Sequence, residues 1–157
     1  TALSAAFGDI NNDGYVDLFV TAEGHLSFFS GPGTAAQHSD KLYLNNGDLT
    51  FTDISDSYIV NSPVSTGAQG SCAASFGHFD DDDNIDLFVF VCNEVNFAPT
   101  PVHVYQNNGD NTFTDVAATT QLDKGGFWMC SALADIDNDG DQDIFSTNLG
   151  GGNNHHL

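Results

Sequence analysis

Short apolar or alternating runs recur along this chain in pairs, and each pair encloses a polar stretch rich in aspartate. Residues 5–8, 73–77 and 131–134 precede the polar stretches, and residues 18–20, 87–91 and 144–145 follow them. Runs this short, with alternation and many Phe and Val residues, are typical of β-strands. No segment has a sustained period of about 3.6 residues, so we expect almost no helix.

A second pattern alternates with the first. Residues 42–53 read Leu-Tyr-Leu-Asn-Asn-Gly-Asp-Leu-Thr-Phe-Thr-Asp, and residues 104–115 read Val-Tyr-Gln-Asn-Asn-Gly-Asp-Asn-Thr-Phe-Thr-Asp. Asn-Gly between aromatic and β-branched runs predicts a β-hairpin. Each unit therefore has two strands around the aspartate-rich loop and two around the Asn-Gly turn. Four strands in a repeat of about 60 residues is the size of a propeller blade.

These repeats divide the chain into unit 1 (residues 1–60), unit 2 (61–121) and an incomplete unit 3 (122–157). About two and a half blades are present, whereas a closed propeller needs about four to eight. We therefore predict an all-β chain of four-stranded antiparallel blades in a propeller-like array. We expect it to be part of a longer protein, or of an assembly whose neighbours cover its open strand edges.

The aspartate-rich stretches repeat one nine-residue pattern. Loop 1 (residues 9–17) reads Asp-Ile-Asn-Asn-Asp-Gly-Tyr-Val-Asp, and loop 3 (135–143) reads Asp-Ile-Asp-Asn-Asp-Gly-Asp-Gln-Asp. Loop 2 (78–86) reads His-Phe-Asp-Asp-Asp-Asp-Asn-Ile-Asp. Oxygen-bearing side chains at the first, third, fifth and ninth positions, with glycine at the sixth, suit a hard cation. Calcium, which takes about six to eight oxygen ligands, is the expected metal.

The charge of the chain supports a bound cation. There are 22 acidic residues against two lysines and no arginine, and the formal net charge is −20. Loop 1 holds three of the acidic residues and loops 2 and 3 hold five each, which is 13 of the 22. Such clustering is repulsive unless cations are present. So few basic groups exclude nucleic acid and anionic membranes as direct partners, and no apolar run predicts membrane insertion.

The two linked motifs resemble the FG-GAP-like repeats, also called VCBS-type repeats, which are related to the repeats of the integrin α-subunit β-propeller. The residues that carry the resemblance are Ala-Ala-Phe-Gly-Asp-Ile-Asn-Asn-Asp-Gly at 5–14 and the hairpin segments at 42–53 and 104–115. The resemblance implies bladed β-structure with calcium in the loop between the first two strands of each blade. It also implies an extracellular or surface role in adhesion, recognition or scaffolding, and some relatives belong to polysaccharide-degrading enzymes.

The resemblance also implies a set of calcium ligands. In loop 1 they are the side chains of Asp9, Asn11, Asp13 and Asp17 and the carbonyl of Tyr15. In loop 3 they are Asp135, Asp137, Asp139 and Asp143 with the carbonyl of Asp141. Loop 2 keeps Asp80, Asp82 and Asp86 but has His78 at the first position and Asp83 in place of the glycine. Imidazole is a poor calcium ligand, so we expect two full sites and a third that is weaker or absent.

The loop pattern has two other interpretations. An EF-hand begins in the same way but ends with glutamate at position 12 between two helices. Position 12 is Val20 in loop 1 and Ser146 in loop 3, and strands flank both loops. Acidic surface turns without metal are the second alternative, and the linked repetition argues against them.

The cysteines leave the compartment open. Cys72, Cys92 and Cys130 fit no zinc or redox spacing. One disulfide with one remaining thiol and three buried small side chains are both compatible with the sequence.

The sequence therefore predicts a secreted or surface-exposed calcium-binding module for adhesion, recognition or structural assembly. Its expected partners are calcium, protein or carbohydrate at the cell surface, and further copies through open strand edges. No nucleophile or phosphate-loop motif is present, so catalysis is not expected. The alternative is a catalytic or non-catalytic propeller of a polysaccharide-active enzyme.

Overall fold

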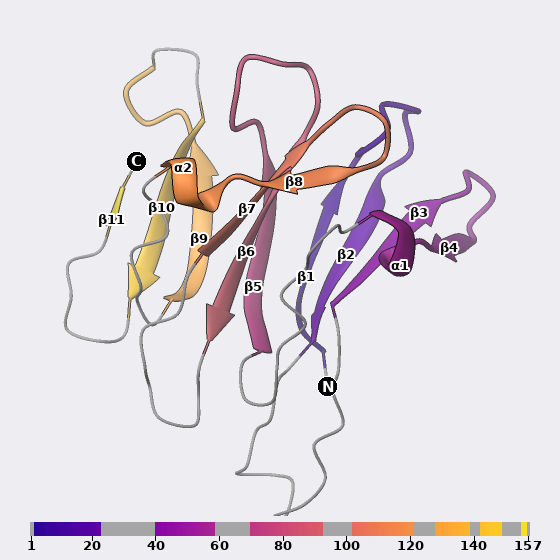
Figure 1. Cartoon of the computed structure of the whole chain (residues 1–157), viewed down its shortest axis with the longest axis horizontal. Coiled ribbons are helices and arrows are strands. Elements are labelled where there is room, and N and C mark those ends of the chain that lie inside the picture. Colours follow the sequence, from indigo (N-terminus) through magenta and orange to yellow (C-terminus); the bar gives the residue numbers. More distant parts are fainter. Residues whose placement is uncertain are drawn as a thin grey trace, which may run out of the picture.

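Three antiparallel sheets stand side by side in the part of the chain that the structure describes (Figure 1). The structure is a computed structural model that describes residues 2–22, 40–58, 70–92, 102–120, 128–138, 142–148 and 155–156. The predicted unit boundaries at 60/61 and 121/122 fall outside these residues or at their edge, so they stay predictions.

Each sheet is built from strands in chain order. The first comprises β1 (Ala2–Gly8), β2 (Asp17–Ala22), β3 (Lys41–Asn45) and β4 (Phe51–Asp53). The second comprises β5 (Gly70–Gly77), β6 (Asp86–Cys92), β7 (Val102–Asn107) and β8 (Phe113–Asp115). The third comprises β9 (Trp128–Ala134), β10 (Asp143–Asn148) and β11 (His155–His156), with β10 in the middle.

The predicted hairpins form around the Asn-Gly turns. In the first sheet Asn46 N–H donates to the carbonyl of Thr50 at 3.0 Å, and in the second Asn108 N–H donates to Thr112 at 2.9 Å. Gly47 and Gly109 have φ values of 74° and 76°, which glycine adopts without a steric penalty. The local turn chemistry therefore fixes the pairing of β3 with β4 and of β7 with β8.

Helix is almost absent among the described residues, as the sequence predicts. Two single turns, α1 (Ser55–Tyr58) and α2 (Ala117–Thr120), follow the last strands of the first and second sheets. Asp53 Oδ1 accepts the backbone N–H of Ser55, and Asp115 Oδ1 accepts that of Ala117, both at 3.0 Å. These caps explain why each turn begins two residues after its aspartate. The predictions of an all-β chain and of four-stranded antiparallel sheets are thus confirmed.

The hydrophobic core lies between neighbouring sheets. Between the first and second sheets, Phe19 and Leu42 pack with Leu87, Tyr105 and Phe113 in one cluster. Between the second and third sheets a second cluster forms. It contains Phe88, Phe90, Val104, Ile144 and the partly buried Leu133. Both faces of the second sheet are therefore covered, which explains the almost uninterrupted apolar run of β6.

Glycine at the end of the first strand allows the sheets to approach closely. A Cβ atom on Gly8 would lie 2.7 Å from Cγ of Phe76, and one on Gly77 would lie 2.6 Å from Cδ1 of Leu133. Phe76 and Leu133 each precede the last residue of the first strand of their own sheet. The same glycine contact therefore joins the first sheet to the second and the second to the third. Phe7 holds the corresponding position in the first sheet.

The outer face of the first sheet remains uncovered. Phe7 is 62% exposed and Phe51 is 44% exposed, whereas Phe113, the counterpart of Phe51 in the second sheet, is 2% exposed. At the other end of the array Phe145, on β10, and Ile136, in loop 3, are likewise exposed. The same apolar pattern is thus buried in the middle of the array and exposed at its two ends.

Two further findings concern the cysteines and the membrane. Cys72 is disulfide-bonded and Cys130 carries an exposed free thiol, which agrees with the first of the two alternatives. No helix in the described part of the chain has the length and apolarity needed to cross a membrane.

The glycine contact predicts a large effect of a small substitution. We expect Gly8→Ala to lower the free energy of unfolding by about 1–3 kcal/mol, because the added methyl group collides with the Phe76 ring. Urea unfolding followed by tryptophan fluorescence measures this change. Ala134→Ser, at the exposed counterpart position of the third sheet, is the control and should change stability by about 0.5 kcal/mol or less. Equal losses in the two variants would contradict the close approach.

Candidate functional site

The three aspartate-rich loops lie together at one end of the array (Figure 1). Each joins the first two strands of its sheet, and the sheets stand in the same orientation. Neighbouring loops are in contact. Asn12 Nδ2 of loop 1 donates to Asn84 Oδ1 of loop 2 at 3.3 Å, and the backbone N–H of His78 in loop 2 donates to Gln142 Oε1 of loop 3 at 3.0 Å. The sequence pattern thus places its candidate ligands on one surface.

Loop 1 is organised by its own carboxylates. Asp9 accepts the backbone N–H groups of Asp13 and Gly14 at 3.0 and 2.8 Å, one on each oxygen. Asn11 Oδ1 accepts the N–H of Asp13 at 3.2 Å, and Asp13 Oδ1 accepts that of Tyr15 at 2.8 Å. These contacts turn the oxygen-bearing side chains of the first, third and fifth positions toward the inside of the loop.

Two residues of loop 1 adopt positive φ. Asn12 has a φ of 57° and Gly14 a φ of 88°, and asparagine and glycine are the residue types that adopt this region most readily. The glycine that the motif places at position 6 is therefore required by the backbone. In loop 3, Asn138 at position 4 has a φ of 61°, so the two loops share this part of their path.

The ninth residue of loops 1 and 2 anchors each loop to its sheet. Asp17 is fully buried and accepts the N–H of Ile10 at 2.9 Å and that of Asn45, on β3, at 2.8 Å. Asp86 is likewise buried and accepts the N–H groups of Phe79 and Asn107 at 2.7 and 2.8 Å. Burial raises the pKa of both carboxyls, and the backbone hydrogen bonds partly oppose that rise.

Loop 3 brings three carboxylates together. Single oxygens of Asp135, Asp137 and Asp143 all lie within 4.8 Å of one another. The N–H of Ile136 donates to Asp143 Oδ2 at 2.8 Å, the same anchor as in the other loops. The two other predicted ligands of this loop, Asp139 and Asp141, lie outside the described residues. No such triplet occurs in loops 1 and 2, whose residues are all described.

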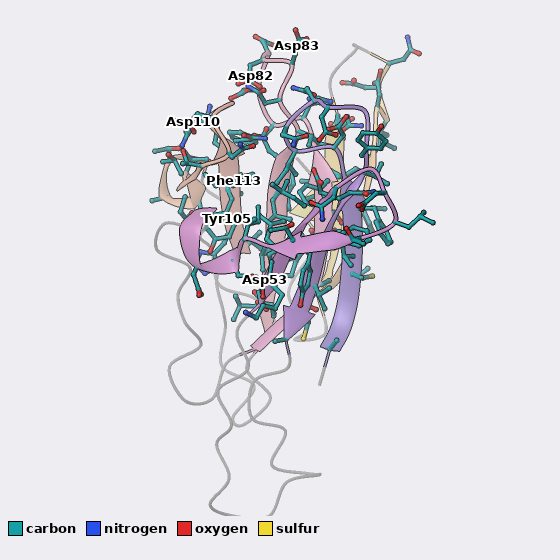
Figure 2. All side chains as sticks on the ribbon, turned by 90° about the vertical axis from the view of Figure 1, so that its right-hand side faces the viewer. Asp53, Asp82, Asp83, Tyr105, Asp110 and Phe113 are labelled. Carbon is teal, nitrogen blue, oxygen red and sulfur yellow. The ribbon has the colours of Figure 1, made fainter. Side chains whose placement is uncertain are left out.

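Loop 2 differs where its sequence differs. His78 Nδ1 lies 3.1 Å from the carbonyl oxygen of Asn84, and neither Asp81 nor Asp83 has a positive φ. Asp82 accepts the backbone N–H of Asn84 at 2.8 Å, and this bond, with a second from the Asn84 side chain, lowers the pKa of Asp82. Figure 2 shows Asp82 and Asp83 at the tip of the loop, away from the sheet.

The sequence reasoning missed the asparagine that precedes each Asn-Gly turn. Asn107 is 1% exposed, and its side-chain amide donates to the carbonyl of Ile10 at 2.8 Å and to that of Ile85 at 3.1 Å. It therefore connects loop 1, loop 2 and the second hairpin. Asn45 donates at 3.0 Å only within unit 1, to Val16. The sequence signal for this role is the asparagine that stands directly before Asn-Gly in both hairpins. The hairpin pattern alone accounts for that asparagine, so the contact between units is not predicted.

The anchoring role of Asp86 is testable. We expect Asp86→Asn to lower the free energy of unfolding by about 1–3 kcal/mol, because an amide places a donor against one of two buried N–H groups. Chemical denaturation in the presence of chelator measures this without any contribution from metal. Asp81→Asn, on the exposed part of the same loop, serves as the control. If the two variants lost similar stability, the anchor would not have the importance assigned to it.

Comparison with known proteins agrees with this architecture. The model of the FG-GAP-like repeat matches residues 78–146, and the model of the FG-GAP repeat matches residues 1–35. No curated protein matches the chain. The matched segments include all of loops 1, 2 and 3, whereas β5, the strand before loop 2, lies outside them. This chain therefore belongs to the FG-GAP-like repeat family, whose repeats are blades of β-propellers.

Proposed function

We propose that the chain is a calcium-binding β-propeller repeat module that serves adhesion, recognition or structural assembly outside the cell. The observation that carries the calcium proposal is the convergence of Asp135, Asp137 and Asp143 within 4.8 Å. Three carboxylates at this spacing repel one another, and a divalent cation among them would remove that repulsion. The donor set consists of oxygen alone, which is what calcium prefers.

Loops 1 and 3 would hold the ion. In loop 1 the candidate ligands are Asp9, Asn11, Asp13, Asp17 and the carbonyl of Tyr15. In loop 3 they are Asp135, Asp137, Asp139, Asp143 and the carbonyl of Asp141. When bound, calcium supplies charge neutralisation and a fixed geometry rather than chemistry on a substrate. Because the folded loop binds the ion and the unfolded chain does not, binding and stability are linked.

The proposed location follows from the family and the charge. FG-GAP repeats are typical of extracellular proteins, and calcium loops of modest affinity fill where calcium is abundant. With a net charge of −20 the surface repels nucleic acid and anionic lipid. Protein or carbohydrate at the cell surface remains the expected class of partner.

A catalytic role has less support. A glycosidase needs two carboxyls that reach the substrate, one of them with a raised pKa. Among the described residues burial raises the pKa of Asp17, Asp40 and Asp86, but all three carboxylates accept backbone N–H groups inside the fold. We therefore propose a binding module rather than an enzyme.

Calcium binding is tested by titrating the chelator-treated chain in a calorimeter and by melting it with and without the ion. We expect loops 1 and 3 to bind calcium and the melting temperature to rise. At free calcium about 100 times Kd, each filled site stabilises the folded chain by about 2.7 kcal/mol. An absence of binding, with stability indifferent to chelator, would refute the proposal.

Single substitutions then locate the ion. We expect Asp135→Ala to lower the melting temperature measured in calcium more than Asp81→Ala does, since Asp135 belongs to the triplet and Asp81 to the exposed part of loop 2. In chelator the difference between the two variants should shrink. Equal or reversed losses in calcium would count against the ligand assignment.

An assembly role is favoured by the uncovered face of the first sheet. Phe7, Val16 and Phe51 are 62%, 54% and 44% exposed, and apolar side chains exposed on a sheet face offer a surface for a partner. We expect the chain to self-associate through this face, so that sedimentation shows species larger than the monomer at high concentration. Phe7→Ser should shift the distribution toward the monomer.

The control for this test is Leu49→Ser. Leu49 is 98% exposed in the turn of the first hairpin and lies outside the strands of the sheet, so its substitution should leave association unchanged. A chain that is strictly monomeric with and without calcium, or an equal effect of both substitutions, would rule out the face as an assembly surface.

A further inference from the structure

Loop 2 follows a different backbone path from its two counterparts. Positive φ occurs at Asn12 and Gly14 in loop 1 and at Asn138 in loop 3, but at no residue of loop 2, all of which are described. Asp83 stands where loop 1 has Gly14, and an aspartate pays a steric penalty at positive φ that glycine does not. The left-handed turn of loop 1 is therefore absent from loop 2.

His78 replaces an acceptor by a donor at the first position. In loop 1, Asp9 uses both oxygens to accept backbone N–H groups. In loop 2, His78 Nδ1 lies 3.1 Å from the Asn84 carbonyl, and because a carbonyl only accepts, Nδ1 carries the hydrogen and donates it. That carbonyl is the counterpart of the Tyr15 carbonyl, an expected calcium ligand. The ring hydrogen therefore bonds the carbonyl that a cation site would use.

A second donor enters from the neighbouring strand. Gln106 Nε2, on β7, donates to Asp80 Oδ2, while Asp80 Oδ1 accepts the N–H of Asp82 at 3.1 Å. The counterpart of Gln106 in unit 1 is Leu44, whose side chain has no hydrogen to donate. Side-chain donors thus reach two acceptors of loop 2, the Asn84 carbonyl and Asp80 Oδ2.

We propose that loop 2 is not a calcium site and is instead braced by hydrogen bonds, with the N–H groups of His78 and Gln106 in place of the cation. The proposal rests on the calcium sites proposed for loops 1 and 3. It explains three residues together: His78 and Gln106 supply the donors, and Asp83 accompanies the loss of the left-handed turn. The middle blade then keeps its loop when calcium is scarce, and calcium acts on the units at either side.

The first test restores the motif. Calorimetric titration with calcium alone should give two sites for the wild-type chain and three for the double variant His78→Asp/Asp83→Gly. The double variant should also melt at a lower temperature than the wild type in chelator, because it lacks the imidazole donor. A folded double variant that still binds two ions would overturn the assignment of His78 and Asp83 as the groups that exclude calcium.

The second test needs no gain of function. Gln106→Leu copies the residue of unit 1, and it should lower the melting temperature by about 2–4 °C, the change expected for one net hydrogen bond in a chain of this size. The loss should be the same in calcium and in chelator. Asp81→Asn is the control and should leave the melting temperature unchanged in both. A loss seen in calcium alone would show that Gln106 supports a metal site.

The wild-type chain separates failure of this inference from failure of the proposed function. Three sites in the wild type, reduced to two by Asp80→Asn/Asp82→Asn, would show that loop 2 binds calcium and would overturn the inference. No sites at all would refute the calcium proposal for loops 1 and 3. Two sites that the same double substitution leaves in place would support both.

Discussion

The carboxylate at the end of each loop, fully buried in loops 1 and 2, is the interaction on which this architecture depends. Asp17 and Asp86 each accept one N–H from their own loop and one from the third strand of their sheet. Burial of a carboxylate is unfavourable and raises its pKa, so it persists only where donors are already in place. The strands place those donors, and loop and sheet therefore stabilise each other.

The same constraint extends between blades. Asn107 lies between the carbonyls of loops 1 and 2, Ser71 donates to Asp40 of the preceding unit at 2.6 Å, and the hydroxyls of Ser75 and Ser131 lie 2.8 Å apart. The same sheets also share the apolar clusters. At these interfaces a glycine of one sheet contacts a side chain of the next, Phe76 on Gly8 and Leu133 on Gly77. Register between blades is thus set by pairs of groups that have few alternative partners.

One loop template gives three different local structures. Loop 1 is organised by Asp9 and a left-handed glycine, loop 3 gathers three carboxylates, and loop 2 draws donors from His78 and Gln106. In all three, the carboxylate at position 9 accepts the N–H of the second loop residue. The contact of the ninth residue is therefore common to the three loops, while the oxygens at the other positions have different partners in each blade.

The sequence by itself determined the strands, the hairpins, the three loops and the near absence of helix, because alternation and Asn-Gly turns act locally. It did not determine burial. Phe7 and Phe76 share the same local sequence, Phe-Gly, yet Phe7 is exposed while Phe76 packs on Gly8 of the neighbouring sheet. Nor did it reveal that Asn107 bridges two units or that His78 bonds the Asn84 carbonyl. Only the tertiary structure decided these, because burial and hydrogen bonding depend on which surface lies opposite a residue.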